Sequence, residues 1–160
     1  MDERFRTIIP QLALFGGLDE VEQEKVASLV RWETFAAGAA VGRQGEVAET
    51  MYILVEGRCR VLMDIDDSGH PFTLAELGPG QCFGEMALVE IQPRSASVVA
   101  LTDVVVAGLT NSDFMTLYDW RITTYSLVLL NIAREISRRL RRANEVIAAC
   151  ARAVRENWKS

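Results

Sequence analysis

Frequent glycines divide residues 34–110 into segments too short for long helices, and this constrains the fold more than any other feature of the chain. Met51–Val55 is a continuous apolar run, and an alternating pattern follows Gly57. In that pattern one face of a strand is predicted to carry Cys59, Val61, Met63 and Ile65, and the other Arg58, Arg60 and Asp64. Short alternating segments between glycine turns are typical of antiparallel sheets. We therefore expect residues 34–110 to form an antiparallel β-roll or jelly-roll.

Turn-forming residues separate the remaining predicted strands. Asp66–Gly69 predicts a turn, after which Phe72–Leu77 can return as a hairpin partner. Gly78–Gly80 contains a proline between two glycines and predicts a further turn. Ser97–Ala100 and Val104–Leu109 are rich in β-branched residues, which favour strands.

Helical patterns precede the roll. Phe5–Leu14 has helical apolar spacing, but Pro10 interrupts it. Asp19 is a candidate N-cap because Glu22 follows it at the spacing of a capping box. We expect the N-terminal helix to span residues 19–32. Its predicted apolar face consists of Val21, Val26, Leu29 and Val30.

Residues 112–157 are predicted to be helical again. Asp113 can cap the first turn, and Leu127–Val154 contains neither glycine nor proline. We expect one long helix over that stretch, about 42 Å in length. The whole pattern predicts an α+β fold that is mainly β, organised as a single domain over residues 1–160. Its β-roll carries an N-terminal helix and C-terminal helices, the last one long.

The composition argues against several classes of function. A net charge of −5 and a pI of about 5.0 are unlike those of a chain that coats nucleic acid. The three cysteines, Cys59, Cys82 and Cys150, show no metal-binding or disulfide spacing. The single histidine, His70, is too few for a multi-histidine metal site and belongs to no catalytic motif. No stretch of about 18 apolar residues is present. We expect a cytoplasmic protein without membrane contact, catalytic residues, metal or cofactor.

Residues 83–98 carry the chemistry. Gly84 allows a ligand to approach the backbone closely. Glu85–Val89 can form one helical turn whose free N–H groups, including that of Ala87, would point at an anion. Arg94 follows a proline that stiffens its approach, and its guanidinium can clamp a phosphate through two parallel hydrogen bonds. The segment therefore predicts an anion site.

Glu85 needs a different partner, because an anion repels a carboxylate. A ribose 2′-hydroxyl would suit it, since it can donate a hydrogen bond. Ser95 and Ala96 are small and leave room for a ligand. A lone arginine after proline is usually a solvated charge, and a Gly-Glu pair is common. Together, however, one anion and one hydroxyl in a small pocket describe a ribose cyclic phosphate.

This segment resembles the phosphate-binding cassette of the cyclic nucleotide-binding domain family. The chain has the family form F-G-E-x-A-L, a short spacer and P-R-x-A-[ST]-V from Phe83 to Val98. Upstream, Gly45-Glu46, Met51–Ile53 and Val55–Gly57 also match the family, and the resemblance covers roughly residues 10–142. It is strongest toward bacterial members, including prokaryotic cyclic nucleotide-gated channels and the sensor half of the catabolite activator class.

The resemblance implies roles for individual residues. Arg94 would bind the cyclic phosphate, with help from the Ala87 N–H and the Ser95 hydroxyl. Glu85 would bind the 2′-hydroxyl beside the Gly84 backbone. The candidate ligand-binding residues are Phe83, Gly84, Glu85, Met86, Ala87, Arg94, Ser95, Ala96, Val61 and Leu77. Of these, Val61 and Leu77 match positions that flank the base, although ordinary core positions would explain them equally well. The ligand would be cAMP or cGMP, and the likeness to bacterial cAMP receptors favours cAMP.

The long C-terminal helix carries two further patterns. A heptad-like apolar stripe of under three repeats consists of Ile136, Leu140, Ala143, Ile147, Cys150 and Val154. In the catabolite activator class the equivalent helix pairs two subunits, so we expect a homodimer; a helix folded back on its own roll is the alternative. The same helix carries many basic residues, which either form a solvated face or contact nucleic acid. Candidates to cover the base are Arg134, Glu135, Arg138 and Arg139.

Three functions fit these observations to different degrees. A stand-alone cyclic nucleotide sensor that signals to an unknown partner protein fits best. A transcription regulator without its own DNA-binding domain is the alternative, because residues 151–160 are too few for a helix-turn-helix. A metal-dependent β-roll enzyme fits least, given the single histidine. We therefore expect a binding protein, not an enzyme, with nucleic acid an improbable partner.

Overall fold

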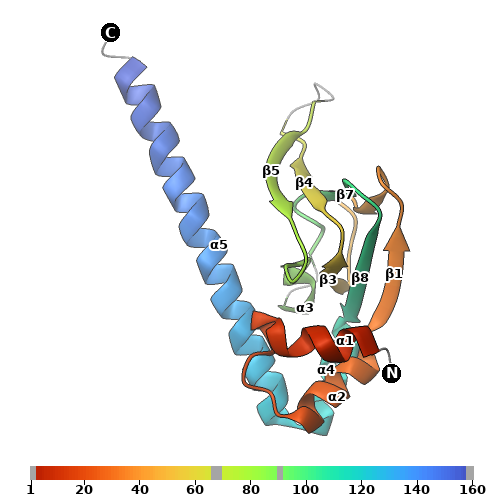
Figure 1. Cartoon of the computed structure of the whole chain (residues 1–160). Helices are drawn as coiled ribbons and strands as arrows, with labels where there is room; N and C mark the ends of the chain where they lie inside the picture. The colour runs from red at the N-terminus through yellow and green to blue at the C-terminus, as the bar shows by residue number, and fades with distance from the viewer. Residues whose placement is uncertain (1–2, 66–69, 90–91, 158–160) are drawn as a thin grey trace.

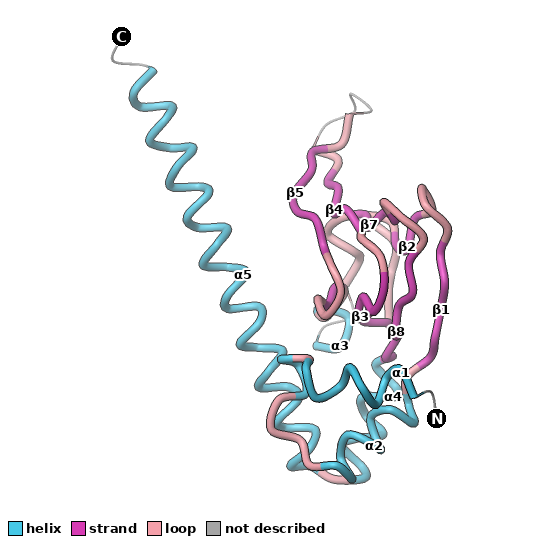
Figure 2. Tube along the Cα trace, viewed as in Figure 1, coloured by secondary structure: helices cyan, strands magenta, loops and turns pink. Residues whose placement is uncertain are grey.

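The computed structural model describes residues 3–65, 70–89 and 92–157, and its core is an antiparallel roll of two four-stranded sheets (Figures 1 and 2). The strands are β1 (Arg31–Phe35), β2 (Ala40–Gly42), β3 (Thr50–Glu56), β4 (Cys59–Met63), β5 (Phe72–Leu77), β6 (Cys82–Phe83), β7 (Ser97–Ala100) and β8 (Val104–Thr110). One sheet has the order β1-β8-β3-β6 and the other β2-β7-β4-β5. The predicted fold class is confirmed.

Helices pack together at one end of the roll, and the last helix extends from there away from the roll (Figure 1). The α-helices are α1 (Glu3–Ile8), α2 (Glu20–Leu29), α3 (Met86–Val89), α4 (Asn111–Trp120) and α5 (Ile122–Asn157). Two short 3-10 helices, η1 (Ile9–Gln11) and η2 (Ala13–Phe15), link α1 to α2. The helical spacing from Phe5 is thus broken around Pro10, because its ring allows only a tight turn there.

Strand β3 is buried on both faces and separates two hydrophobic clusters. Met51 and Ile53 pack with the helices, whereas Tyr52 and Leu54 point into the interior of the roll. A strand covered on both sides needs apolar residues at every position, which explains the unbroken run at Met51–Val55. The roll and its helical cap are therefore joined through one central strand.

The N-terminal helix is shorter than predicted. Asp19 and Glu22 form both hydrogen bonds of the capping box, as expected, but α2 ends at Leu29. Trp32 lies in β1, paired with Ala107, so the roll begins at Arg31 instead of residue 34. The predicted apolar face is also partly wrong, because Val26 is fully buried but Val21 is 57% exposed. Residues 31–35 pair with β8, and this pairing stabilises a strand there although the apolar spacing of residues 30–32 favours a helix.

The predicted hairpin is confirmed, with β4 pairing to β5 from Cys59–Leu77 to Met63–Phe72. The predicted turn at 66–69 lies outside the described residues. Ile65 lies beyond the end of β4 and is 67% exposed, so the predicted alternation stops at Met63. The remaining strands, β7 and β8, match their predicted positions to within one residue.

Two polar contacts fix the start of α5 against the N-terminal segment. The Thr124 hydroxyl donates to a Glu22 carboxylate oxygen at 2.6 Å, and the Asn131 amide donates to the carbonyls of Leu14 and Gly16 at 3.1 and 3.0 Å. These contacts bury polar groups with partners, as folded proteins require. The predicted long helix therefore begins at Ile122, five residues earlier than expected from its sequence.

The cap of α4 also differs in detail from the expectation. Thr110 is the N-cap residue, and Asp113 is its partner three residues on in a second capping box. Asp113 thus stabilises the first turn, but from inside the helix. Farther along, every described side chain of α5 from Leu140 to Glu156 is exposed. Within the part of the chain that the structure describes, no helix is long and apolar enough to cross a membrane.

Candidate functional site

The predicted cassette forms a tight strand-to-helix corner. The chain leaves β6 at Phe83, turns at Gly84 with φ of +71°, and enters α3. This left-handed φ favours glycine, which has no Cβ to clash. One expectation fails here, because the Ala87 N–H donates to the Gly84 carbonyl at 3.0 Å and is not free for an anion. The single turn of α3 satisfies that donor internally.

Glu85 is buried at this corner and pairs with the long helix. Its residue exposure is 7%, and its Oε1 accepts a hydrogen bond from Arg139 Nη1 at 3.0 Å. Arg139 also donates to the Cys82 carbonyl and, through Nε, to Glu135 at 3.2 Å. The sequence left four candidates on α5 to cover the base, and that role stays a prediction; one of them, Arg139, contacts Glu85 of the cassette.

The charges around Arg139 favour its ionised form. Burial opposes the positive charge, but the Glu85 carboxylate, followed by Cys82 and Glu135, outweighs burial and holds the pKa of Arg139 above its ordinary value. Burial also raises the pKa of the Cys82 thiol to about 11, so this cysteine is a neutral neighbour. Arg139 therefore stays charged at neutral pH.

Arg94 is the cation of the cassette, in contrast to the carboxylate of Glu85. Its backbone is fixed on the turn before β3, because Arg94 N–H donates to the Glu46 carbonyl and Gly45 N–H donates to the Arg94 carbonyl, each at 2.9 Å. Its guanidinium carbon lies 5.9 Å from the centre of the Tyr52 ring. Among the described residues, no carboxylate pairs with this guanidinium. A half-buried arginine without a carboxylate partner is suited to an external anion.

The other predicted site residues fall into two groups. Phe83 and Leu77 are buried in the core of the roll, and Val61 packs partly buried against that core. Their positions match the core interpretation of Val61 and Leu77 without deciding whether they also touch a base. Met86 is 52% exposed, Ser95 is exposed and Ala96 is half-buried. The predicted site residues thus divide between the core of the roll and its surface.

Two residues near Arg94 were missed by the sequence interpretation. Gly42 is one of the glycines that divide residues 34–110 into short segments, and Tyr52 was predicted only as part of a strand that matches the family. In the structure a Cβ on Gly42 would lie 2.7 Å from Arg94 Nε, and the Tyr52 ring lies beside the guanidinium. Neither contact has a sequence signal, because each joins a strand to the loop of Arg94, which is far away in the chain.

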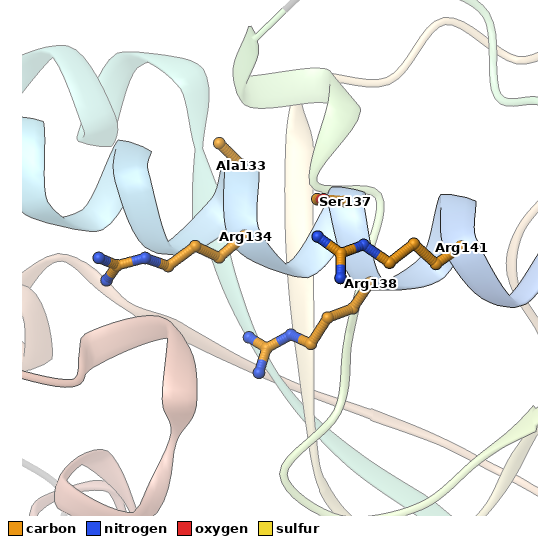
Figure 3. A pocket seen from close by; sticks show the side chains of 5 residues that line it. All are labelled: Ala133, Arg134, Ser137, Arg138 and Arg141. Atoms are coloured by element: carbon orange, nitrogen blue, oxygen red, sulfur yellow. The ribbon is translucent and has the colours of Figure 1, made fainter.

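A separate hollow of about 450 Å³ lies along α5 (Figure 3). Its lining residues are Ala133, Arg134, Ser137, Arg138 and Arg141. All come from one helix, so the hollow has a single basic wall and does not include the cassette. Across residues 3–65, 70–89 and 92–157, no cluster of three metal-ligating side chains occurs. The cassette remains the candidate site.

The antiparallel roll and its cassette define a candidate ligand-binding domain, and comparison with known proteins identifies its family. The profile described as "Cyclic nucleotide-binding domain" matches residues 32–119, more than half of the chain. The chain therefore belongs to the cyclic nucleotide-binding domain family. This family is regulatory and not catalytic.

Several known proteins are similar to this chain. The cyclic AMP receptor protein of Thermus thermophilus is 35% identical over 131 residues, which cover 82% of this chain and 58% of that protein. A cyclic nucleotide-gated potassium channel of Rhizobium etli is 37% identical over 110 residues, 69% of this chain and 29% of the channel. The solved structure of the Thermus thermophilus catabolite activator protein superposes with a TM-score of 0.76 at 32% identity, over 87% of this chain and 63% of that one. The chain thus spans less than two thirds of these relatives.

Proposed function

We propose that this chain binds a cyclic nucleotide at residues 83–98 and acts as a sensor that signals to a partner, not as an enzyme. The observation that carries the proposal is that the cassette holds both a cation, Arg94, and a carboxylate, Glu85. Arg94 has no carboxylate partner within the described residues, whereas Glu85 is a buried carboxylate. One cation for a phosphate and one acceptor for a hydroxyl suit a ribose cyclic phosphate.

Each group has a defined task in this proposal. Arg94 binds the cyclic phosphate through two charge-assisted hydrogen bonds. Glu85 accepts from the ribose 2′-hydroxyl through Oε2, since Oε1 is occupied by Arg139. The Ser95 hydroxyl is exposed and available to the phosphate. The Ala87 N–H can help only if α3 shifts, because it is bonded to Gly84.

Among cyclic nucleotides, we favour cAMP over cGMP. The support is the likeness to the cyclic AMP receptor protein of Thermus thermophilus. Adenine and guanine differ where they would meet α5 and Ser95, whose hydroxyl could serve the phosphate or a guanine amino group. Val61 and Leu77 would flank either base. The choice between the two nucleotides therefore depends on contacts at the edge of the site.

The output of the sensor is proposed to pass through α5. Glu85 contacts Arg139, so a ligand that engages Glu85 changes the contacts of the helix directly. Beyond Arg139 the apolar residues are uncovered, with Leu140 60%, Ile147 65% and Val154 55% exposed. We propose that this stripe pairs two copies of the chain, because exposed apolar heptads are typical of helix pairing. A downstream protein would then recognise the state of the dimer.

A role in transcription is the second candidate. It is favoured by the likeness to the catabolite activator protein and by the basic wall of Arg134, Arg138 and Arg141. Gel-shift titration with random duplex DNA separates the two functions. Binding that falls steeply with salt supports contact with nucleic acid, and no binding at low salt supports the sensor alone.

Calorimetric titration with cAMP and with cGMP tests the proposed function. We expect dissociation constants in the micromolar range or tighter, about −8 kcal/mol or better. The chain with Arg94→Ala is the matched control and should lose most of this affinity. The proposal fails if neither nucleotide binds to the wild-type chain at about 1 mM, which corresponds to roughly −4 kcal/mol.

A further inference from the structure

Three separate strands and loops surround the Arg94 side chain. A Cβ on Gly42 in β2 would lie 2.7 Å from Arg94 Nε and 3.0 Å from Cδ and Cζ. A Cβ on Gly84 would lie 2.9 Å from Nη1. The ring of Tyr52 in β3 lies 5.9 Å from Cζ. The guanidinium therefore rests where two glycines leave space and one aromatic ring provides a surface.

Gly42 differs from the other glycines around the roll in what it contributes. Its φ lies outside the left-handed region, so the backbone would accept an alanine without strain. The three nearest atoms to an added Cβ all belong to Arg94. Those atoms are the end of a flexible side chain, which would move before the strand did. The absence of a side chain at position 42 thus affects mainly the position of the Arg94 side chain.

Tyr52 is held in place by its own neighbours. It is 9% exposed, and its ring centroid lies 5.5 Å from that of Phe83. Gly108 on the adjacent strand leaves room for it, since a Cβ there would lie 3.1 Å from Tyr52 Cε1. Because the ring is fixed, its face offers a fixed surface for a guanidinium. The surface beside Arg94 is built into the core.

We propose that Gly42 and Tyr52 are positioning residues that hold Arg94 in the orientation that receives the ligand phosphate. The inference rests on the proposed function, because it concerns how the same site is prepared for its ligand. Gly42 supplies the space into which the side chain extends, and Tyr52 supplies the supporting ring. Neither residue needs to touch the nucleotide.

Gly42→Ala is the first test, and Gly78→Ala is its matched control. Gly78 lies in a turn of the roll with ordinary φ, and the nearest atom to an added Cβ is 4.0 Å away. We expect Gly42→Ala to weaken cAMP binding at least about tenfold, because a displaced guanidinium loses one charge-assisted hydrogen bond. The thermal midpoint should stay within about 2 °C of wild type, since only a side chain moves. Gly78→Ala should bind like the wild-type chain.

The same substitution in an Arg94→Ala background separates positioning from a general structural effect. The Arg94→Ala change removes the atoms that an added Cβ would meet, so Gly42→Ala should then cause no further loss of affinity. Tyr52→Leu should weaken binding about two- to fivefold only where Arg94 is present, whereas Tyr52→Phe keeps the ring and should bind normally. Losses that add fully in the Arg94→Ala background would overturn the inference.

A ligand-free measurement keeps this inference distinct from the proposed function. The Arg94 Nε–Hε signal in a ¹H–¹⁵N NMR spectrum can be assigned by its absence in Arg94→Ala. We expect Gly42→Ala to shift that signal and Gly78→Ala to leave it in place. An unshifted signal overturns the positioning role. Failure of the wild-type chain to bind any cyclic nucleotide would instead overturn the proposed function, whatever the signal does.

Discussion

The two halves of α5 occupy opposite environments although they form one continuous helix. In the first half, Val128 and Ile132 are fully buried against the helical cap. In the second half, every described side chain from Leu140 to Glu156 is exposed, including Ile147. Arg139, the last half-buried residue, bonds to Glu85 of the cassette. The helix therefore leaves the domain at the point where it meets the candidate site.

The two halves of α5 should therefore contribute to different properties of the protein. The first half is part of the folded domain, so its substitutions should change the stability of the protomer. The second half has no partner within the described chain, so its substitutions should change association between copies. The predictions below test this division, beginning with the largest expected effect.

The largest effect should come from Ile132. Ile132→Ala removes a fully buried side chain and should reduce the free energy of unfolding by about 2–5 kcal/mol. The same change at Ile147, which is 65% exposed, should cost less than about 0.5 kcal/mol in the protomer. Urea unfolding at low protein concentration measures both. Equal losses at the two positions would remove the basis of the comparison.

The next effect concerns the pairing of two copies. Ile147→Glu places a charge in the exposed apolar stripe and should weaken the proposed dimer about a hundredfold or more. Ala148→Glu is the matched control, because it adds the same charge one residue away on the neighbouring face. Sedimentation velocity over a concentration series measures the association. A wild-type chain that stays monomeric at high concentration, with and without nucleotide, contradicts the dimer.

A smaller effect should distinguish two adjacent arginines at the boundary. Arg139→Ala leaves the buried Glu85 carboxylate without its partner and should lower the free energy of unfolding by about 1–2 kcal/mol. Arg138→Ala removes only a solvent-exposed ion pair with Glu135 at 3.3 Å and should change the free energy of unfolding by less than about 0.5 kcal/mol. Thermal unfolding of the three chains at neutral pH gives the comparison. If both variants lose the same amount, the contact of Arg139 with the cassette is not a stabilising one.

The smallest effect is a pH dependence at the start of α5. The hydrogen bond from Thr124 is the main cause that holds the pKa of Glu22 below its ordinary value of 4.5, although burial opposes it. A lowered folded pKa gives stability that is present above about pH 4.5 and is lost as the pH falls through the folded pKa. Wild type should therefore lose stability relative to Glu22→Gln on acidification below that pH. Urea unfolding over a pH series checks this, and parallel curves would contradict it.

Local patterns predicted much of the fold. The capping box at Asp19 and Glu22 and the β4–β5 hairpin depend on residues close in the chain, so their spacing was informative. Trp32 was wrongly placed in a helix, because its pairing with Ala107 comes from a strand far along the chain. Contacts between distant elements have no spacing to reveal them.

The candidate site shows the same limit. The cassette from Phe83 to Val98 was located by its residue pattern, and its strand-to-helix corner is as expected. The bond of the Ala87 N–H to Gly84 was not foreseen, because a single helical turn can either expose or satisfy that donor. The contact of Arg139 with Glu85 depends on how α5 is rotated against the roll. That rotation is set by tertiary contacts such as those of Asn131.

In the proposed mechanism, occupancy of the cassette reaches the exposed half of α5 through Glu85 and Arg139. Hydrogen–deuterium exchange of the wild-type chain with and without saturating cAMP tests it most directly. We expect slower exchange in residues 83–98 together with a change in residues 140–156, and no change in 140–156 for Arg139→Ala with nucleotide bound. Slower exchange confined to 83–98 in the wild-type chain, with 140–156 unaltered, would contradict the account.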